Sequence, residues 1–164
     1  MSFLIRLRAA GLPVLCGALA LAGCGREAAT RDDPAFVPMA GNPSLPFSAA
    51  VRVGDMLYLS GQLGTDSTGA LVPGGIEPET RQAMRNIRVL VEANGSSMDR
   101  VVKCLVMLAD MREWSAMNRV YVTFFPDQLP ARSAMGASGL ALGARVEIEC
   151  VAVVADGSAG RTDG

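Results

Sequence analysis

The stretch ARVEIECVAVVA, residues 144–155, constrains the fold more than any other part of the chain. Its apolar residues alternate along one side of a strand: Val146, Ile148, Cys150, Ala152 and Val154. Because successive side chains of a strand point to opposite sides, Glu147 and Glu149 share the other side with Val151 and Val153. The pattern predicts a final strand with one face in the core and a second face that carries both charge and apolar surface.

Other strand and helix patterns precede it. SAAVRVGDMLYLSGQLG alternates around Gly54-Asp55, which predicts a β-hairpin over residues 48–62. PETRQAMRNIRVLVEAN has apolar residues at helical spacing and predicts a helix over residues 78–94, opened by Pro78 and closed by Asn94-Gly95. RVVKCLVMLADM is apolar and short enough for a buried strand.

A second helix should begin at Asp110, which forms a capping-box pattern with Glu113. The helical spacing predicts a core stripe made of Trp114, Met117, Tyr121 and Phe124. A further short strand should begin near Arg132. The order β-β-α-β-α-β-β predicts an α+β fold with one mixed sheet and two helices packed on one face. Val151 and Val153 would then meet water on the other face, so we expect a homo-oligomer.

The N-terminus has the pattern of a targeting segment. MSFLIRLR is positive, and residues 9–23 carry no charge but are too few for a membrane span of about 20 apolar residues. LAGC at its end resembles the lipobox of bacterial lipoproteins, which predicts lipidation and cleavage at Cys24. An ordinary secretory signal and an apolar N-terminal helix are the alternatives. Gly25, where inner-membrane retention would favour Asp, points to the outer membrane and a periplasmic location.

These patterns divide the chain into four parts. Residues 1–23 are the predicted lipoprotein signal peptide, and residues 24–45 a flexible tether containing Pro34, Pro38 and Pro43. Residues 46–156 form the predicted domain, and residues 157–164 a loose C-terminal tail.

Composition excludes several kinds of chemistry. The chain has no histidine, which rules out a Ser-His-Asp triad, a Cys-His pair and a histidine-ligated metal. Lys103, the only lysine, lies in an apolar strand pattern, which argues against Schiff-base cofactors. The net charge of −1 would become −3 after loss of Arg6 and Arg8, which argues against nucleic acid as a partner. Cys104 and Cys150 lie in strand patterns and fit small buried apolar residues best, with a periplasmic disulfide as the alternative.

Six segments resemble, in order, those of the Rid family of reactive intermediate deaminases, also called YjgF. They are PFSAAV, LYLSGQLG, QAMRNIRVLVEANGSSMDRVVKCLVMLADM, MNRVYVTFF, PARSAM and GARVEIECVAVV, within about residues 42–155. The resemblance implies a chorismate-mutase-like fold and a homotrimer with sites in the clefts between subunits. It also implies hydrolysis of imino acids such as 2-aminoacrylate to 2-keto acids and ammonia, with no metal and no organic cofactor.

The resemblance assigns roles to two charged residues. Arg132 matches the family arginine that binds the substrate carboxylate, a task suited to its planar pair of donors. Glu147 matches the glutamate that positions or activates the attacking water. A surface arginine beside a loop is the alternative for Arg132, Glu149 is the rival of Glu147, and Arg145 could form a salt bridge with either glutamate. We expect Arg132 and Glu147 to face one cleft.

Four further residues match the family pattern as substrate-binding positions. Ser60 and Gly61 of LSGQ would line the cleft, and Asn118 matches a family site position. Ser60 could equally be a strand-end cap and Asn118 an exposed helix residue. Phe47 stands where many deaminases of the family have tyrosine, so the ring is kept and one hydroxyl is missing.

The leading hypothesis is a membrane-tethered imine/enamine deaminase whose substrate is already activated, so that orientation and one placed water suffice. The alternative is a non-catalytic binding or sensor module for small carboxylates that uses the same arginine. Ribonuclease activity or translation control is disfavoured by export and by the acidic charge.

Overall fold

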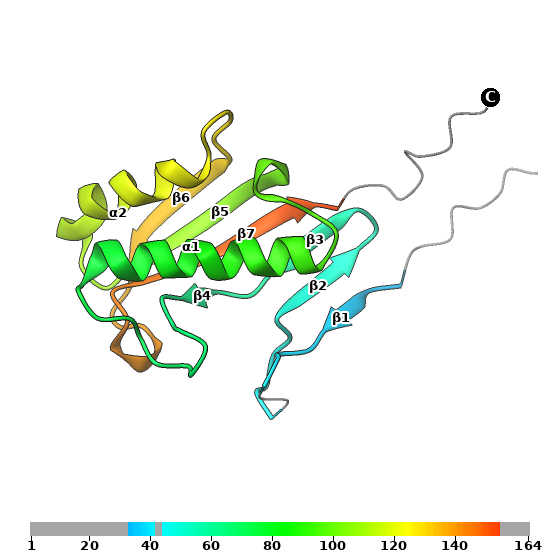
Figure 1. Ribbon diagram of the computed structural model, residues 1–164, viewed down its shortest axis with the longest axis horizontal. Helices are drawn as coiled ribbons and strands as arrows, with labels where there is room; N and C mark the ends of the chain where they lie inside the picture. Colours follow the sequence, from blue (N-terminus) through cyan, green and yellow to red (C-terminus); the bar gives the residue numbers. More distant parts are fainter. Residues whose placement is uncertain (1–32, 42–43, 155–164) are drawn as a thin grey trace, which may run out of the picture. The chain divides into compact units, whose positions relative to one another are not determined.

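The computed structural model describes residues 33–41 and 44–154, in which seven strands form one mixed sheet (Figure 1). The strands are β1 (Ala35–Val37), β2 (Ala50–Val53), β3 (Met56–Leu59), β4 (Gln62–Leu63), β5 (Val101–Leu108), β6 (Ala131–Gly136) and β7 (Val146–Val153). The helices are α1 (Ile76–Ala93) and α2 (Trp114–Tyr121), with short 3-10 turns η1 (Met98–Arg100), η2 (Met111–Glu113), η3 (Val122–Phe124) and η4 (Ala141–Gly143). The predicted signal peptide, Cys24 and the predicted tail over 157–164 lie outside the described residues.

The strand order is β1-β2-β3-β7-β5-β6, with β4 paired to β7. Among the strands of the described residues, β5·β6 is the one parallel pairing and the other pairings are antiparallel. Both helices lie on the same face of this sheet (Figure 1), which confirms the predicted α+β architecture. No helix among the described residues is long and apolar enough to cross a membrane.

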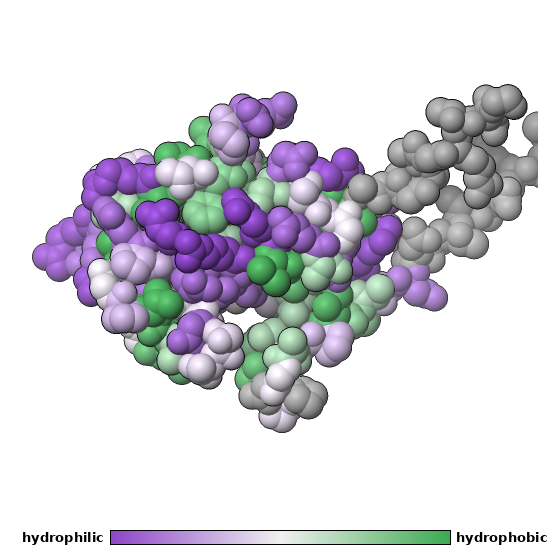
Figure 2. Space-filling model, viewed as in Figure 1, coloured by the Kyte–Doolittle hydropathy of each residue, from purple (hydrophilic) through white to green (hydrophobic). Residues whose placement is uncertain are grey.

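The core lies between the sheet and the helices. The five alternating residues of the last strand pattern are all buried, as predicted: Val146, Ile148, Cys150, Ala152 and Val154. They meet buried side chains of β5 and α1, among them Val106, Met84 and Ile87. Hydrophilic residues run along the outer side of α1 (Figure 2). Buried apolar residues recur at every second position in β7 and about every 3.6 positions in α1. This spacing is the reason that the first segment forms a strand and the second a helix.

Helix α1 begins two residues before the predicted start at Pro78. A proline fits the first helical turn because its missing N–H would have no partner there. Gly74 and Gly75, both with positive φ, bring the chain into the helix, and Gly95 with φ 77° ends it. The Asn94 side chain donates a hydrogen bond to the carbonyl of Leu90 (2.7 Å), so the predicted C-terminal signal is confirmed.

Strand β1 lies inside the 24–45 segment for which the sequence predicts a tether. Its three residues pair antiparallel with β2, Phe36 opposite Val51. A strand this short, between Pro34 and Pro38, has no periodicity to reveal it. It is defined by backbone pairing with the edge of the sheet rather than by its own sequence.

The start of the second helix also differs from prediction. The Asp110 carboxylate accepts a hydrogen bond from the Arg112 amide, but it caps the 3-10 turn η2, and α2 begins only at Trp114. The Glu113 carboxylate bonds the Arg145 side chain, so it does not close a capping box. Met117, Tyr121 and Phe124 are buried as predicted, whereas Trp114 is 39% exposed and is not a core residue.

A disulfide joins Cys104 of β5 to Cys150 of β7. The two residues are register partners in the antiparallel pair and both side chains are buried. The sequence left this open and favoured two small apolar side chains. Cys104 and Cys150 are both buried, as favoured from the sequence, and they also form a disulfide across the neighbouring strands β5 and β7.

We expect reduction of the disulfide to lower the free energy of unfolding by about 2–4 kcal/mol, because it closes a long loop in the unfolded chain. The two cysteines are separated by 46 positions. Urea unfolding with and without reductant would measure the change, with thiol titration to verify reduction. The double variant Cys104→Ala/Cys150→Ala should lose the sensitivity to reductant. Equal unfolding midpoints for the oxidised and fully reduced protein would contradict the expectation.

Candidate active site

Arg132 lies on β6, the edge strand of the sheet, and its side chain is directed at helix α2. Its Nη1 donates a hydrogen bond to Oδ1 of Asn118 (2.6 Å). Its guanidinium carbon lies 4.7 Å from the centre of the Tyr121 ring and 5.8 Å from the centre of the Trp114 ring. Aromatic rings and an amide oxygen thus surround one side of a half-buried cation.

The three residues around Arg132 form one stripe of α2. Trp114, Asn118 and Tyr121 stand at i, i+4 and i+7 and therefore share a helix face. The sequence assigned Trp114 and Tyr121 to the core and treated Asn118 separately, so the roles of both rings at the site were missed. The spacing of the two aromatic residues around Asn118 is the signal that could have revealed them.

The positive charge of Arg132 is not neutralised within the described part of the chain. No salt bridge there involves Arg132, and of its five N–H donors one is used by Asn118. A guanidinium with several donors left over fits an incoming carboxylate, which can accept two parallel hydrogen bonds.

Tyr121 is 2% exposed, and its hydroxyl has no hydrogen-bond partner in the described structure. Burial raises the pKa of Tyr121 to about 12, and the nearby Arg132 charge only partly opposes this. The phenol therefore stays neutral at physiological pH. Its ring also packs against Phe125, with centroids 5.1 Å apart.

Glu147 lies on β7, on the face of the sheet away from the helices. A Cβ placed on Gly61 would lie 1.9 Å from Oε1 of Glu147, so only glycine allows this approach. The pairing of Leu63 in β4 with Glu147 brings the two segments together. Glu147 is half-buried, whereas its rival Glu149 is exposed. The structure thus places Glu147 against another predicted site residue.

Ser60 and Phe47 lie at the end of the β2·β3 hairpin. The Ser60 hydroxyl donates to the carbonyl of Ser48 (2.6 Å), which corresponds to the strand-end role considered for it. Phe47, the residue before Ser48, is 51% exposed. The ring is therefore available at the surface close to the Ser60-Gly61 segment.

A single chain does not bring Arg132 and Glu147 into one cleft. Arg132 pairs with Cys104, which pairs with the buried Cys150, so its side chain lies on the helix face of the sheet. Glu147 is three positions from Cys150 on β7 and points to the opposite face. The predicted site residues fall into two groups, Arg132 with Asn118 and Glu147 with Gly61. The expectation of one shared cleft is not met within one chain.

In the described structure Arg145 pairs with Glu113, and not with Glu147 or Glu149 as the sequence suggested. Its Nε and Nη2 donate to the Glu113 carboxylate, which raises the pKa of the guanidinium. Its backbone amide donates to Oε2 of the buried Glu79 (2.8 Å). Arg145 thus fixes the segment that enters β7.

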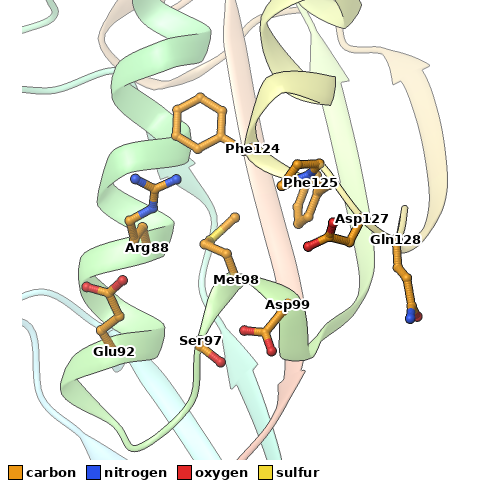
Figure 3. Close-up of a pocket in the computed structure, with 10 residues that line it drawn as sticks. Arg88, Glu92, Ser97, Met98, Asp99, Phe124, Phe125, Asp127 and Gln128 are labelled. Carbon is orange, nitrogen blue, oxygen red and sulfur yellow. The ribbon is translucent and has the colours of Figure 1, made fainter.

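A separate hollow of about 520 Å³ lies between α1, η1 and the segment after α2 (Figure 3). Phe124, Phe125 and Met98 form apolar walls, and the guanidinium carbon of Arg88 lies 5.0 Å from the Phe124 ring centre. None of the predicted site residues lines it. Nowhere in residues 33–41 and 44–154 do three or more acidic, cysteine or histidine side chains gather to hold a metal ion.

Comparison with known proteins places this arrangement in a family. Residues 39–154 match the family model described as Endoribonuclease L-PSP. A mouse protein named 2-iminobutanoate/2-iminopropanoate deaminase is 46% identical over 109 residues, covering 66% of this chain and 81% of the relative. A RutC family protein from Pyrococcus horikoshii is 39% identical over 118 residues, 71% of this chain and 94% of the relative. The solved structure of a Rid-family protein of unknown function from Yersinia pestis superposes with a TM-score of 0.69 at 34% identity, covering 74% of this chain and all of that one.

The contact between Gly61 and Glu147 predicts a substitution that moves one carboxylate without unfolding the protein. In Gly61→Ala the new methyl group meets the end of a flexible side chain, so we expect the free energy of unfolding to change by less than about 1 kcal/mol while Glu147 changes rotamer. Urea unfolding and a crystal structure of the variant would measure both effects.

Gly64→Ala is the matched control. Its Cβ would lie 2.6 Å from backbone atoms of Glu79, which cannot rotate away, so it should destabilise the protein by about 1–3 kcal/mol. Equal destabilisation by the two substitutions, or an unmoved Glu147 in Gly61→Ala, would refute this account.

Proposed function

Because the chain belongs to the L-PSP family that includes the Rid and YjgF proteins, we propose that it is an imine/enamine deaminase. Its substrates would be reactive imino acids of the 2-aminoacrylate type and their enamine tautomers, and its products 2-keto acids and ammonia. The observation that carries the proposal is Arg132, held by Asn118 and two aromatic rings with no carboxylate partner in the described structure. Relatives that are 41–47% identical and named as deaminases support it.

The proposed reaction needs two tasks from the protein. Arg132 binds the substrate carboxylate through two parallel N–H donors and so orients the imine. Glu147 holds a water molecule and takes a proton from it as the oxygen attacks the imine carbon. The Glu147 carboxyl passes this proton to the nitrogen, which gives a tetrahedral adduct with one hydroxyl and one amino group. A second proton then moves from the hydroxyl to the amino nitrogen, the carbon–nitrogen bond breaks, ammonia leaves and the carbonyl of the 2-keto acid remains. The imine carbon is electrophilic enough for this without a cofactor.

The placement of Arg132 and Glu147 on opposite faces supports a site shared between two chains. Arg132 is on the edge strand β6, where a neighbouring chain can approach it. Glu147 is on the face that the helices leave uncovered. In the proposed assembly, Arg132 and Asn118 of one protomer meet Glu147 and Gly61 of the next.

The uncovered face of the sheet supports the same assembly. Register partners on this face are apolar, Tyr58 opposite Val151 and Met56 opposite Val153. Tyr58 is 48% exposed in the single chain, and Met135 of β6 is 50% exposed. Apolar surface of this kind favours a protein partner, and a closed ring of three identical chains, the homotrimer implied by the family resemblance, would cover it.

We also propose that the protein is exported and tethered by lipid at Cys24, on the periplasmic side of the cell envelope. The positive n-region, the short apolar run and LAGC support this. The Cys104–Cys150 disulfide supports it independently, because structural disulfides persist mainly in oxidising compartments.

A non-catalytic binding module for small carboxylates is the second candidate. It is favoured by one observation, that Arg132 and its three neighbours are complete within a single chain while Glu147 lies on the other face. Such a module would bind keto acids tightly and would not accelerate imine hydrolysis.

The shared site can be tested by mixing two inactive variants. With 2-aminoacrylate generated by a partner enzyme and keto-acid release as the readout, Arg132→Ala should lose both binding and rate, by about a hundredfold or more. Glu147→Ala should lower mainly the rate, also by about a hundredfold or more. If the two variants are refolded together, random assortment should restore about one quarter of the wild-type sites.

Three results would count against these proposals. No recovery in mixed trimers, with each variant folded and trimeric, would refute a site that combines Arg132 of one chain with Glu147 of the next. A wild-type protein that binds keto acids but does not accelerate hydrolysis would favour the binding module. A monomer in solution would remove the basis of the shared site.

The lipid tether has its own test. In bacteria expressing the full chain and fed an alkyne-labelled fatty acid, the wild type should carry the label and fractionate with membranes. Cys24→Ala should lose the label, because acylation of the lipobox cysteine is the anchoring step. Cys16→Ala is the control, since Cys16 lies in the predicted signal peptide and its loss should leave labelling unchanged. Labelling that survives in Cys24→Ala would refute the assignment.

A further inference from the structure

We propose that Tyr121 and Trp114 are positioning residues that hold the guanidinium of Arg132 ready for the substrate carboxylate. This inference rests on the proposed function, because the anion that Arg132 awaits is taken to be the carboxylate of the imino acid. It goes further by assigning two aromatic residues that the family resemblance did not single out for this sequence.

The geometry gives each residue of the α2 stripe a separate part. Oδ1 of Asn118 accepts a hydrogen bond from Nη1 of Arg132 and so fixes the rotation of the guanidinium plane. Tyr121 presents its ring at 4.7 Å from the guanidinium carbon, and Trp114 presents its ring at 5.8 Å. An arginine side chain has many rotamers, and one amide hydrogen bond leaves most of them available. Two ring contacts in addition to that bond restrict the cation to one place.

The two rings differ in how firmly they are held. Tyr121 is buried and packs against the buried Phe125, so its ring is a fixed surface for Arg132. Trp114, the first residue of α2, is 39% exposed, so its ring contact with Arg132 lies partly in water. The stronger positioning effect is therefore assigned to Tyr121, where the contact is shielded from water.

The ring and not the hydroxyl of Tyr121 does the positioning. Its hydroxyl has no partner in the described structure, and the contact with Arg132 is with the ring. Phenylalanine at this position keeps the ring, whereas leucine removes it. The pair Tyr121→Phe and Tyr121→Leu therefore separates positioning from hydrogen bonding.

Loss of positioning should weaken substrate binding more than it slows the chemical step. In Tyr121→Leu the donors of Arg132 are still present, and once they hold the carboxylate the imine is oriented as in the wild type, so the loss falls on the binding step. We expect Tyr121→Leu to raise KM about five- to tenfold with kcat nearly unchanged, and Trp114→Leu to raise KM by a smaller factor of about two to three. Tyr121→Phe should retain the wild-type KM.

Phe124→Leu is the matched control for packing. Phe124 is a buried core residue of η3, and its removal costs core packing. Its ring contacts Arg88, and no ring contact joins it to Arg132 or to the Tyr121 ring in the described structure. It should lower the thermal midpoint much as Tyr121→Leu does and leave KM unchanged. A KM that rises equally in both variants, or that is unchanged in Tyr121→Leu, would overturn the inference.

A second measurement separates this inference from the proposed function. If the wild type shows no deaminase activity, the deaminase proposal fails. The positioning role can still be tested with two other measurements, the dissociation constant for 2-oxobutanoate and the NMR signal of the Arg132 Nε–H. The signal should be sharp and slow to exchange in the wild type and in Tyr121→Phe, and broad or fast to exchange in Tyr121→Leu. An Nε–H signal that is the same in all three proteins would overturn the positioning role whatever the activity.

Discussion

Strand β7 pairs with β3, β4 and β5, and the register of these pairings positions both halves of the candidate site. Cys150 lies opposite Cys104, and Cys104 lies opposite Arg132, so the arginine is tied to the buried face of the sheet. Glu147 lies opposite Met107 and points the other way. A slip of one residue would expose the apolar set of β7 and exchange these faces. Core burial thus decides on which side of the sheet each charged residue lies.

The elements that can be predicted from the sequence are those with one buried face, because their apolar residues then recur at the regular spacing of a strand or a helix. β7 and α1 each have one fully buried face, and both were found with boundaries within two residues at the start. β1 and β4 have three and two residues, too few to show alternation, and they exist because a neighbouring strand offers backbone partners. The prediction that Trp114 lies in the core was wrong because two spacings compete. Trp114 shares a helix face with Met117 at i+3, which fits a core stripe, and equally with Asn118 at i+4, which fits the Arg132 site.

The identities of the candidate site residues came from the resemblance to a family, and their placement was only partly predictable. The alternation of β7 was enough to place Glu147 away from the core. The strand ARSAMG has small residues on both sides, so its sequence does not show which way Arg132 points. Only the parallel pairing with β5 settles that question. The separation of Arg132 and Glu147 is therefore a property of the sheet and could not be seen in the motifs.

This separation has a chemical consequence in the proposed assembly. An arginine and a glutamate on the same face of one chain would attract each other and form a salt bridge, which would occupy the donors needed by the substrate carboxylate. In the described structure neither residue has a partner of opposite charge. With the two on opposite faces, the arginine rests against aromatic rings and the glutamate against a glycine. A cleft between two chains can then hold them apart by the length of a small imino acid, whose own carboxylate neutralises Arg132 while Glu147 remains free to act on water.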